Sequence, residues 1–149
     1  GLLAGAIVDT PGSSAIFSEG AVTYSNAAKV KNLGVKQETL DRFGAVSEET
    51  AREMALGIRA RAESDMGIGI TGIAGPDGGT PEKPVGLVYV AVAYGDQVYV
   101  RRCMTAGDRA KVRHASVLHA FDCVRRILLG MDVQIAREIC ANHLTFERK

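Results

Sequence analysis

The chain contains 149 residues with a formal net charge of +1, and 46% of its residues are hydrophobic while 23% are charged. This balance is typical of one folded domain that buries a sizeable core, and it argues against a broad basic face for nucleic acid. No apolar run approaches the roughly 20 residues of a membrane span. From the charge balance and from this observation, we expect neither nucleic acid nor a membrane as a partner.

The first half of the sequence predicts short helices around one strand. Apolar residues recur at helical spacing near the start, but no capping residue precedes Gly1, so we expect upstream sequence. A turn at 10–14 leads into an alternating stretch that predicts a strand. Ser25 or Asn26 can then cap a helix that Gly34 ends. These elements are, in chain order, a helix at 1–9, a strand at 19–25, and helices at 26–34 and 37–44.

The second half predicts longer helices and three strands. Ser47 can cap a helix whose first turn carries two glutamates, which suits the positive end of the helix dipole. The tight turn at 94–97 predicts an antiparallel hairpin. The elements are, in chain order, a helix at 47–64, strands at 66–72, 87–95 and 97–105, and a helix at 108–129. This alternation predicts the α/β fold class, as a three-layer α/β/α sandwich with a mixed, mostly parallel sheet.

Lys29 lies about one turn after the predicted start of its helix, where a cation opposes the helix dipole. With some burial, the same field would lower the pKa of the Lys29 amine and free it to act as a general base. The alternative is a solvated lysine on an amphipathic helix. Ser25 could meet Lys29 as a nucleophile, although such a serine more often caps a helix. Tyr24 would point to the opposite side of the strand from Ser25.

A loop rich in glycine and proline, "TGIAGPDGGTPEKPVG" at 71–86, follows the strand at 66–72. Glycines allow close backbone approach, so exposed N–H groups there can bind an anion or a carbonyl, and open α/β sheets bind ligands at such edges. The loop is neither a P-loop nor a dinucleotide fingerprint, and the alternative is a long structural turn. Its candidate ligand-binding residues are Thr71, Gly72, Gly75, Pro76 and Gly78.

Cations also crowd the start of the helix at 108–129. Arg109, Lys111 and Arg113 oppose the helix dipole, and an anionic partner such as a phosphate or carboxylate would compensate them. The alternative is a set of scattered solvated charges.

Histidine and cysteine spacing predicts no metal site. The cysteines are odd in number and lack close pairing, which favours reduced thiols in the cytoplasm that pack as small hydrophobic side chains. They are Cys103, Cys123 and Cys140.

Three segments, at 10–35, 44–55 and 71–86, closely resemble the CinA C-terminal domain family. They occur in family order, and the similarity runs from Gly1 to about Leu129. The resemblance implies a three-layer α/β/α fold and hydrolysis of the carboxamide of nicotinamide mononucleotide to nicotinic acid mononucleotide and ammonia. It implies no metal or organic cofactor, and a small-molecule nucleotide as the binding partner. The sequence does not give the oligomeric state, so a homo-oligomer stays open as a further partner.

The resemblance also implies a serine–lysine mechanism. The family's nucleophile is a serine in an upstream Glu-Ser-Cys-Thr-Gly-Gly element, and its base is the lysine of Tyr-Ser-Asn-x-Ala-Lys, here Lys29, with Tyr24 and Asn26 also matching. Gly1 corresponds to the last glycine of the upstream element. The nucleophilic serine would therefore precede the printed sequence, or this polypeptide is inactive, and Ser25 is not assumed to replace it. The alternatives to an enzyme are a nucleotide-binding module and a regulatory domain.

Residues 131–149 continue beyond the expected domain at 1–130. Asp132 can cap a helix, and 144–148 is strand-like. Since a helix and a strand lead into the upstream element in the family, we hypothesise that this tail supplies that pair, which requires Lys149 to lie near Gly1. The alternative is a simple extension of the chain.

Overall fold

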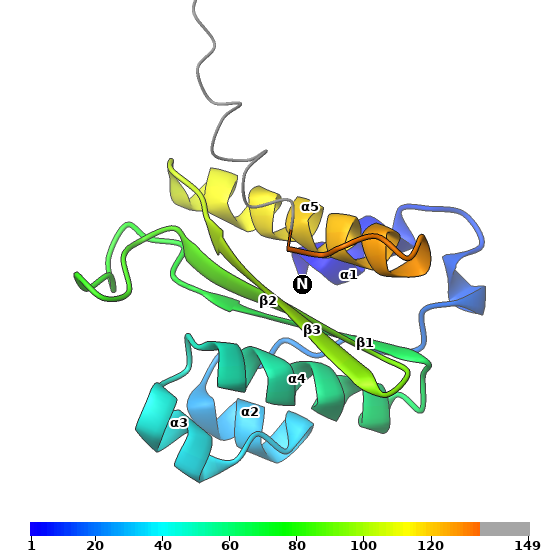
Figure 1. Cartoon of the computed structure of the whole chain (residues 1–149), viewed down its shortest axis with the longest axis horizontal. Coiled ribbons are helices and arrows are strands. Elements are labelled where there is room, and N and C mark those ends of the chain that lie inside the picture. The colour runs from blue at the N-terminus through cyan, green and yellow to red at the C-terminus, as the bar shows by residue number, and fades with distance from the viewer. Residues whose placement is uncertain (135–149) are drawn as a thin grey trace, which may run out of the picture.

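A computed structural model describes residues 1–134 of the chain. Its helices are α1 (Leu2–Val8), the 3-10 helix η1 (Ser13–Ala15), α2 (Asn26–Leu33), α3 (Gln37–Phe43), α4 (Glu48–Arg61) and α5 (Arg109–Leu128), and its strands are β1 (Met66–Gly72), β2 (Leu87–Tyr94) and β3 (Gln97–Met104). The sheet lies between two helical layers, with α4, α2 and α3 on one face and α5 with α1 on the other (Figure 1). This confirms the predicted α/β class.

The sheet formed by the described residues is antiparallel throughout, in the order β1-β2-β3. The predicted hairpin is confirmed, because β2 pairs with β3 up to Tyr94 opposite Gln97. The expected mixed, mostly parallel sheet is wrong for these residues. Parallel neighbours need a crossover connection, usually a helix, whereas the loop at 73–86 simply returns the chain beside β1.

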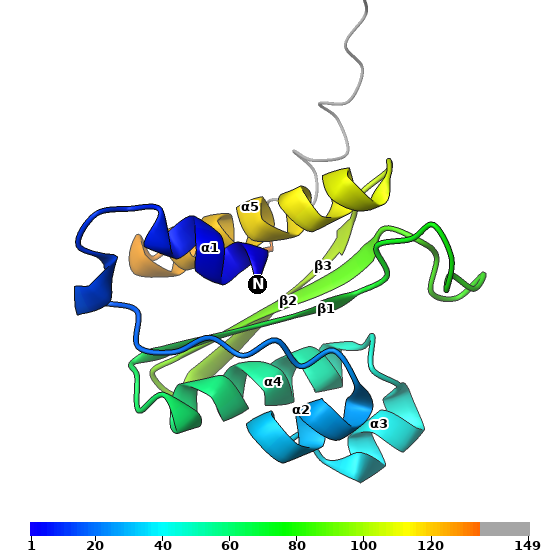
Figure 2. The same ribbon diagram turned by 180° about the vertical axis from the view of Figure 1, so that it is seen from behind.

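Residues 19–25, which were predicted to form a strand, do not form one. The segment is extended and runs past β1 on its way from η1 to α2 (Figure 2). Residues 18–24 make no backbone–backbone hydrogen bond to any described part of the chain. Because a strand exists only through hydrogen bonds to a neighbour, the right side-chain pattern without a neighbour leaves an extended coil.

Two glycines let α4 pack directly on the backbone of β1. A Cβ atom at Gly67 would overlap the Ala55 carbonyl oxygen, and one at Gly69 would lie 2.5 Å from the Ala51 carbonyl oxygen. Side chains alternate along a strand, so Ile68 faces the opposite layer. There it packs against the core of the α5 side.

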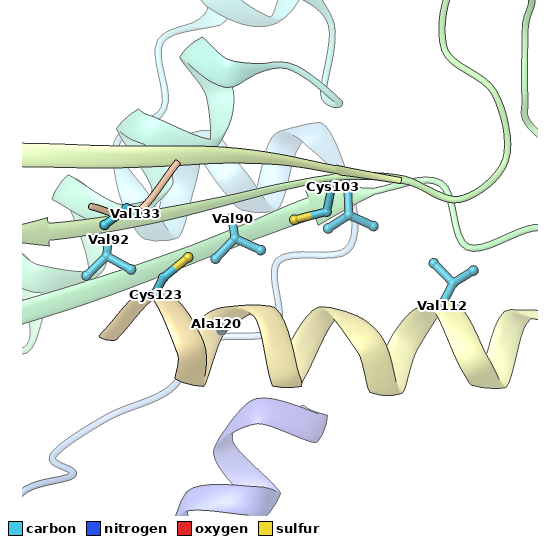
Figure 3. Packing of buried hydrophobic residues seen from close by; sticks show 8 residues of the cluster. Val90, Val92, Cys103, Val112, Ala120, Cys123 and Val133 are labelled. Carbon is cyan, nitrogen blue, oxygen red and sulfur yellow. The ribbon is translucent and has the colours of Figure 1, made fainter. Parts of the chain in front are cut away.

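The larger core cluster lies between the sheet and α5 (Figure 3). Burial raises the pKa of the Cys123 thiol to about 11, so this thiol stays protonated near neutral pH. The prediction that the cysteines pack as small hydrophobic side chains is confirmed for Cys103 and Cys123, while Cys140 lies outside the described residues. The cluster consists of Val88, Val90, Val92, Cys103, Val112, Ala120, Cys123 and Val133.

A buried arginine anchors the chain after α5. Arg101 donates to Asp122 Oδ2 at 2.9 Å and, through two nitrogens, to the Val133 carbonyl at 3.0 and 2.8 Å. Burial of Asp122, which raises its pKa, is outweighed by hydrogen bonds from Arg125, Arg126 and Arg101, which lower it to about 2. The helix and strand predicted beyond residue 134, and the position of Lys149, lie outside the described residues.

The close packing of α4 on β1 predicts that Gly69→Ala destabilises the fold. The new Cβ would force the two backbones apart, and overpacking of this kind costs about 1–3 kcal/mol. Urea unfolding followed by circular dichroism measures the loss. Gly5→Ala is the matched control, because no atom lies within 4 Å of a Cβ at that position. Equal stability of the two variants would contradict this packing.

The arginine cluster predicts that Asp122→Asn costs roughly 3 kcal/mol, because Arg101 would remain buried without its counter-ion. The folded-state pKa of Asp122 lies below the unfolded value of about 3.9, so its stabilisation is present above about pH 4 and is lost as the pH falls toward 2. Unfolding free energies measured between pH 2 and 7 should therefore converge for parent and variant at the acid end. A constant difference across this range would contradict the assignment.

Candidate functional site

A cavity of about 920 Å³ lies along one edge of β1. Its walls come mainly from α1, from the extended segment at 16–24, from α4, from β1, and from α5 between Arg109 and Val124. Six of the residues that the sequence singled out line it: Tyr24, Lys29, Thr71, Gly72, Arg109 and Arg113. Side chains far apart in the sequence therefore share one concave surface.

Lys29 is buried in the wall of this cavity, with 6% of its surface exposed. Its Nζ atom donates to the Thr23 carbonyl at 2.8 Å, and it forms no ion pair with any described residue. Burial lowers the pKa of the Lys29 amine below its ordinary value. A buried amine beside a neutral carbonyl loses hydration without gaining a counter-charge, which favours the unprotonated form.

Ser25 and Asn26 lie at the start of α2 and do not line the cavity. Ser25 Oγ accepts a hydrogen bond from the Ala28 amide at 3.1 Å, so it caps the helix. Both side chains are exposed. The geometry therefore assigns Ser25 the capping role that the sequence left open beside the nucleophilic one.

The glycine-rich loop contributes its first residues to the site and leaves the others at the surface. Thr71 is buried, and its Oγ1 donates to the Ala45 carbonyl at 2.6 Å. Gly75 is buried with a positive φ of 80°, a conformation that favours glycine. Pro76 and Gly78 are exposed and are not part of the cavity wall.

Arg109 connects the loop to the extended segment. Its Nη1 donates to the Gly75 carbonyl at 2.9 Å, and its Nη2 donates to the Tyr24 hydroxyl at 3.4 Å. Arg113, one turn further along α5, lines the cavity and forms no hydrogen bond or ion pair within the described part of the chain. Arg113 is thus the cavity cation whose N–H groups are uncommitted to described residues, whereas Arg109 braces the walls.

Backbone alternation sends the Gly72 N–H toward the cavity. The Ile73 amide donates to Leu87 on β2, and every second residue of an antiparallel strand bonds to the same neighbour. Thr71 and Gly69 therefore bond to β2. The neighbouring Gly72 N–H points the other way, to the side where the cavity lies.

One backbone contribution to the site had no sign in the sequence. The Thr23 carbonyl that holds Lys29 has no side-chain signature, and its position follows from the path of the extended segment. Gly1 and the start of α1 also line the cavity. Among residues 1–134, no group of three or more His, Cys, Asp or Glu side chains is placed to hold a metal ion, and none of the helices there has the length and apolar character needed to cross a membrane.

Comparisons with known proteins agree with this architecture. The profile of the CinA C-terminal domain matches residues 1–128. The competence/damage inducible protein CihA from Agrobacterium tumefaciens is 44% identical in sequence, with a TM-score of 0.81 over 83% of this chain and 76% of that one. The competence damage-inducible protein A (ComA) from Klebsiella pneumoniae is 36% identical, with a TM-score of 0.83 over 87% of this chain and 80% of that one.

Curated relatives are similar over a part of their length. A CinA-like protein from Kosmotoga olearia is 57% identical over 131 residues, which are 88% of this chain and 32% of that relative. The chain thus spans about a third of the length of the curated relatives it matches. The profile match, the sequence identities and the shared fold together establish that the chain belongs to the CinA C-terminal domain family.

Proposed function

We propose that the chain is the catalytic domain of an amidohydrolase that converts nicotinamide mononucleotide to nicotinic acid mononucleotide and ammonia. The observation that carries the proposal is the Lys29 amine, which is buried in a cavity wall with a carbonyl as its partner. An amine with a lowered pKa can accept a proton near neutral pH, which an ordinary surface lysine does poorly. A lysine base serves a hydroxyl nucleophile in acyl transfer.

The proposed reaction has two steps. A serine hydroxyl gives its proton to Lys29 and attacks the carboxamide carbonyl; the proton passes to the leaving nitrogen, and ammonia departs. Water then hydrolyses the acyl-enzyme to the carboxylate. By the family resemblance this serine precedes Gly1, which lines the same cavity as Lys29. The Gly72 N–H is the proposed oxyanion donor, a contribution often worth ~3 kcal/mol.

Arg113 is the proposed ligand of the substrate's phosphate. It lines the cavity, and its guanidinium is uncommitted to described residues. Arg109 already donates to Gly75 and Tyr24, so its role in the proposal is to hold the loop and the extended segment at a fixed separation. A guanidinium matches a phosphate well because it can donate two parallel hydrogen bonds.

Lys29→Met in the full-length protein should lower the rate of ammonia release from nicotinamide mononucleotide by roughly 10²–10⁴, the usual share of a general base. Methionine keeps the volume and removes a buried polar group, so folding should be intact. The matched control is Lys31→Met, which changes an exposed lysine of the same helix. If Lys29→Met retained full turnover, the amine would have no part in the chemistry.

The same assignment predicts the pH dependence of the parent enzyme. A base works when unprotonated, so the rate at saturating substrate should rise with pH and level off below the ordinary lysine pKa of about 10.4. Loss of this basic limb in Lys29→Met identifies the titrating group. If calorimetry showed that the parent protein binds the nucleotide but no ammonia were released, the chain would instead be a nucleotide-binding module without catalytic activity.

Arg113→Gln should raise KM for nicotinamide mononucleotide about 10- to 100-fold, because a hydrogen bond to a charged group is worth roughly 1.5–3 kcal/mol. KM for the corresponding nucleoside, which lacks the phosphate, should stay unchanged. Arg102→Gln, at an exposed arginine outside the cavity, is the control. Equal losses for nucleotide and nucleoside would remove Arg113 from phosphate binding.

A further inference from the structure

The far end of the glycine-rich loop at 71–86 is tied to the turn between α3 and α4. Lys83 is half-buried, and its Nζ atom donates to the Phe43 carbonyl at 2.6 Å. Phe43 is the last residue of α3, and the carbonyl groups at a helix C-terminus lack partners inside the helix. A lysine suits this position because its positive charge also faces the negative end of the helix dipole.

This turn is a shared anchor for several elements. The carbonyls of residues 43–45 each accept a hydrogen bond from a side chain of a different element. Lys83 of the loop binds the first, Thr50 of α4 binds the second at 2.8 Å, and Thr71 at the end of β1 binds the third at 2.6 Å. Ala45 itself lines the cavity. The loop, α4 and the end of β1 are thus held together at one wall of the site.

The loop is closely folded, which links its far end to the end that lies by the cavity. Thr80 and Lys83 form a tight turn in which the amide of each residue donates to an oxygen atom of the other. Val85 packs against the opposite limb of the loop, where a Cβ atom at Gly75 would lie only 2.6 Å from the Val85 Cγ1 atom. A displacement at Lys83 would therefore be transmitted to Gly75.

Two cations hold the loop from opposite sides of the sheet. Arg109, at the start of α5, donates to the Gly75 carbonyl at 2.9 Å, and Lys83 donates to the end of α3. These two helices belong to the layers on opposite faces of the sheet, and the loop leaves the sheet between them (Figure 1). The loop therefore connects both helical layers at the end of β1, where Thr71 and Gly72 line the cavity.

We propose that Lys83 is a positioning residue of the amidohydrolase site. By holding the loop against the turn between α3 and α4, it keeps the base of the loop, with the Gly72 N–H, in place beside the cavity. Lys83 does not line the cavity, so it acts through the loop and not on the substrate. The inference rests on the proposed function, in which the Gly72 N–H stabilises the oxyanion and Arg113 binds the phosphate.

Loss of the Lys83 contact affects the two ends of the substrate differently. The Gly72 N–H belongs to the loop, whereas Arg113 lies on α5, outside the loop. A displaced oxyanion donor weakens binding of the transition state, while binding of the ground state by the arginine is retained. The loss should therefore appear in kcat, whereas Arg113→Gln acts on KM.

Steady-state kinetics of Lys83→Met in the full-length protein test the proposal. We expect kcat for nicotinamide mononucleotide to fall about tenfold and KM to stay within about twofold of the parent, since a misplacement of about 1 Å can cost up to about 100-fold in rate. Lys36→Met, which changes an exposed lysine beside the start of α3, is the control and should keep both values. An unchanged kcat in Lys83→Met, or a loss confined to KM, would overturn the proposal.

Amide hydrogen exchange of the 149-residue chain, measured by NMR, needs no substrate and separates a local effect from general destabilisation. In Lys83→Met, exchange should accelerate at least about tenfold at Thr80, whose amide donates to the Lys83 carbonyl, and stay unchanged at Gly69 and Thr71, which bond to β2. Equal acceleration at all three amides would show that Lys83 only stabilises the fold, and unchanged exchange at Thr80 would show that it does not hold the loop. Either result would contradict the proposal.

The two experiments also keep this inference apart from the proposed function. If the parent protein released no ammonia, the proposed function would fail, together with the catalytic consequence of the Lys83 contact. The exchange comparison would still decide whether Lys83 holds the loop.

Discussion

The contact between the Lys29 amine and the Thr23 carbonyl is the interaction on which the account of the site depends. A buried ammonium group loses its hydration, and a neutral carbonyl returns only part of that energy. No carboxylate among the described residues pairs with the amine, so the balance favours its unprotonated form. The carbonyl holds the amine in a fixed position without adding a negative charge that would raise its pKa. A general base needs both a fixed position and a low enough pKa.

The fold supplies this contact through close packing elsewhere. Glycines at 67 and 69 allow α4 to lie directly on β1, which fixes the strand relative to the helices on that face. Thr71 then stands at the end of β1 with its hydroxyl committed to the Ala45 carbonyl. From the other face, Arg109 reaches across to Gly75 and sets the position of the loop. The cavity is thus bounded by elements that are each held by independent contacts.

Local signals in the sequence predicted the elements well. Ser47 accepts a hydrogen bond from the Thr50 amide and caps α4 as expected, and the turn at 94–97 joins the hairpin. Such features need only neighbouring residues. The predictions of a strand at 19–25 and of a mostly parallel sheet were wrong because strand pairing depends on distant parts of the chain. Among the described residues, no backbone forms hydrogen bonds with residues 18–24, and the three strands pair antiparallel.

Some of the cavity-lining side chains could be selected from the sequence, whereas the backbone groups of the candidate site could not. Lys29 and Arg113 stood out as cations that oppose a helix dipole, and both line the cavity. Spacing alone could not decide whether Ser25 is a nucleophile or a helix cap. The hydrogen bond that Ser25 Oγ accepts from the Ala28 amide shows that it caps the helix. The carbonyl partner of Lys29 carries no signature in the sequence, since every residue has a carbonyl.

The most direct test is the pKa of the Lys29 amine itself, read from the pH titration of its side-chain resonances by NMR in selectively labelled protein, with Lys29→Met to assign the signal. The account predicts a titration midpoint clearly below the ordinary lysine value of about 10.4. A midpoint at or above that value would mean that the amine is an ordinary ammonium group near neutral pH, and the proposed base would be lost.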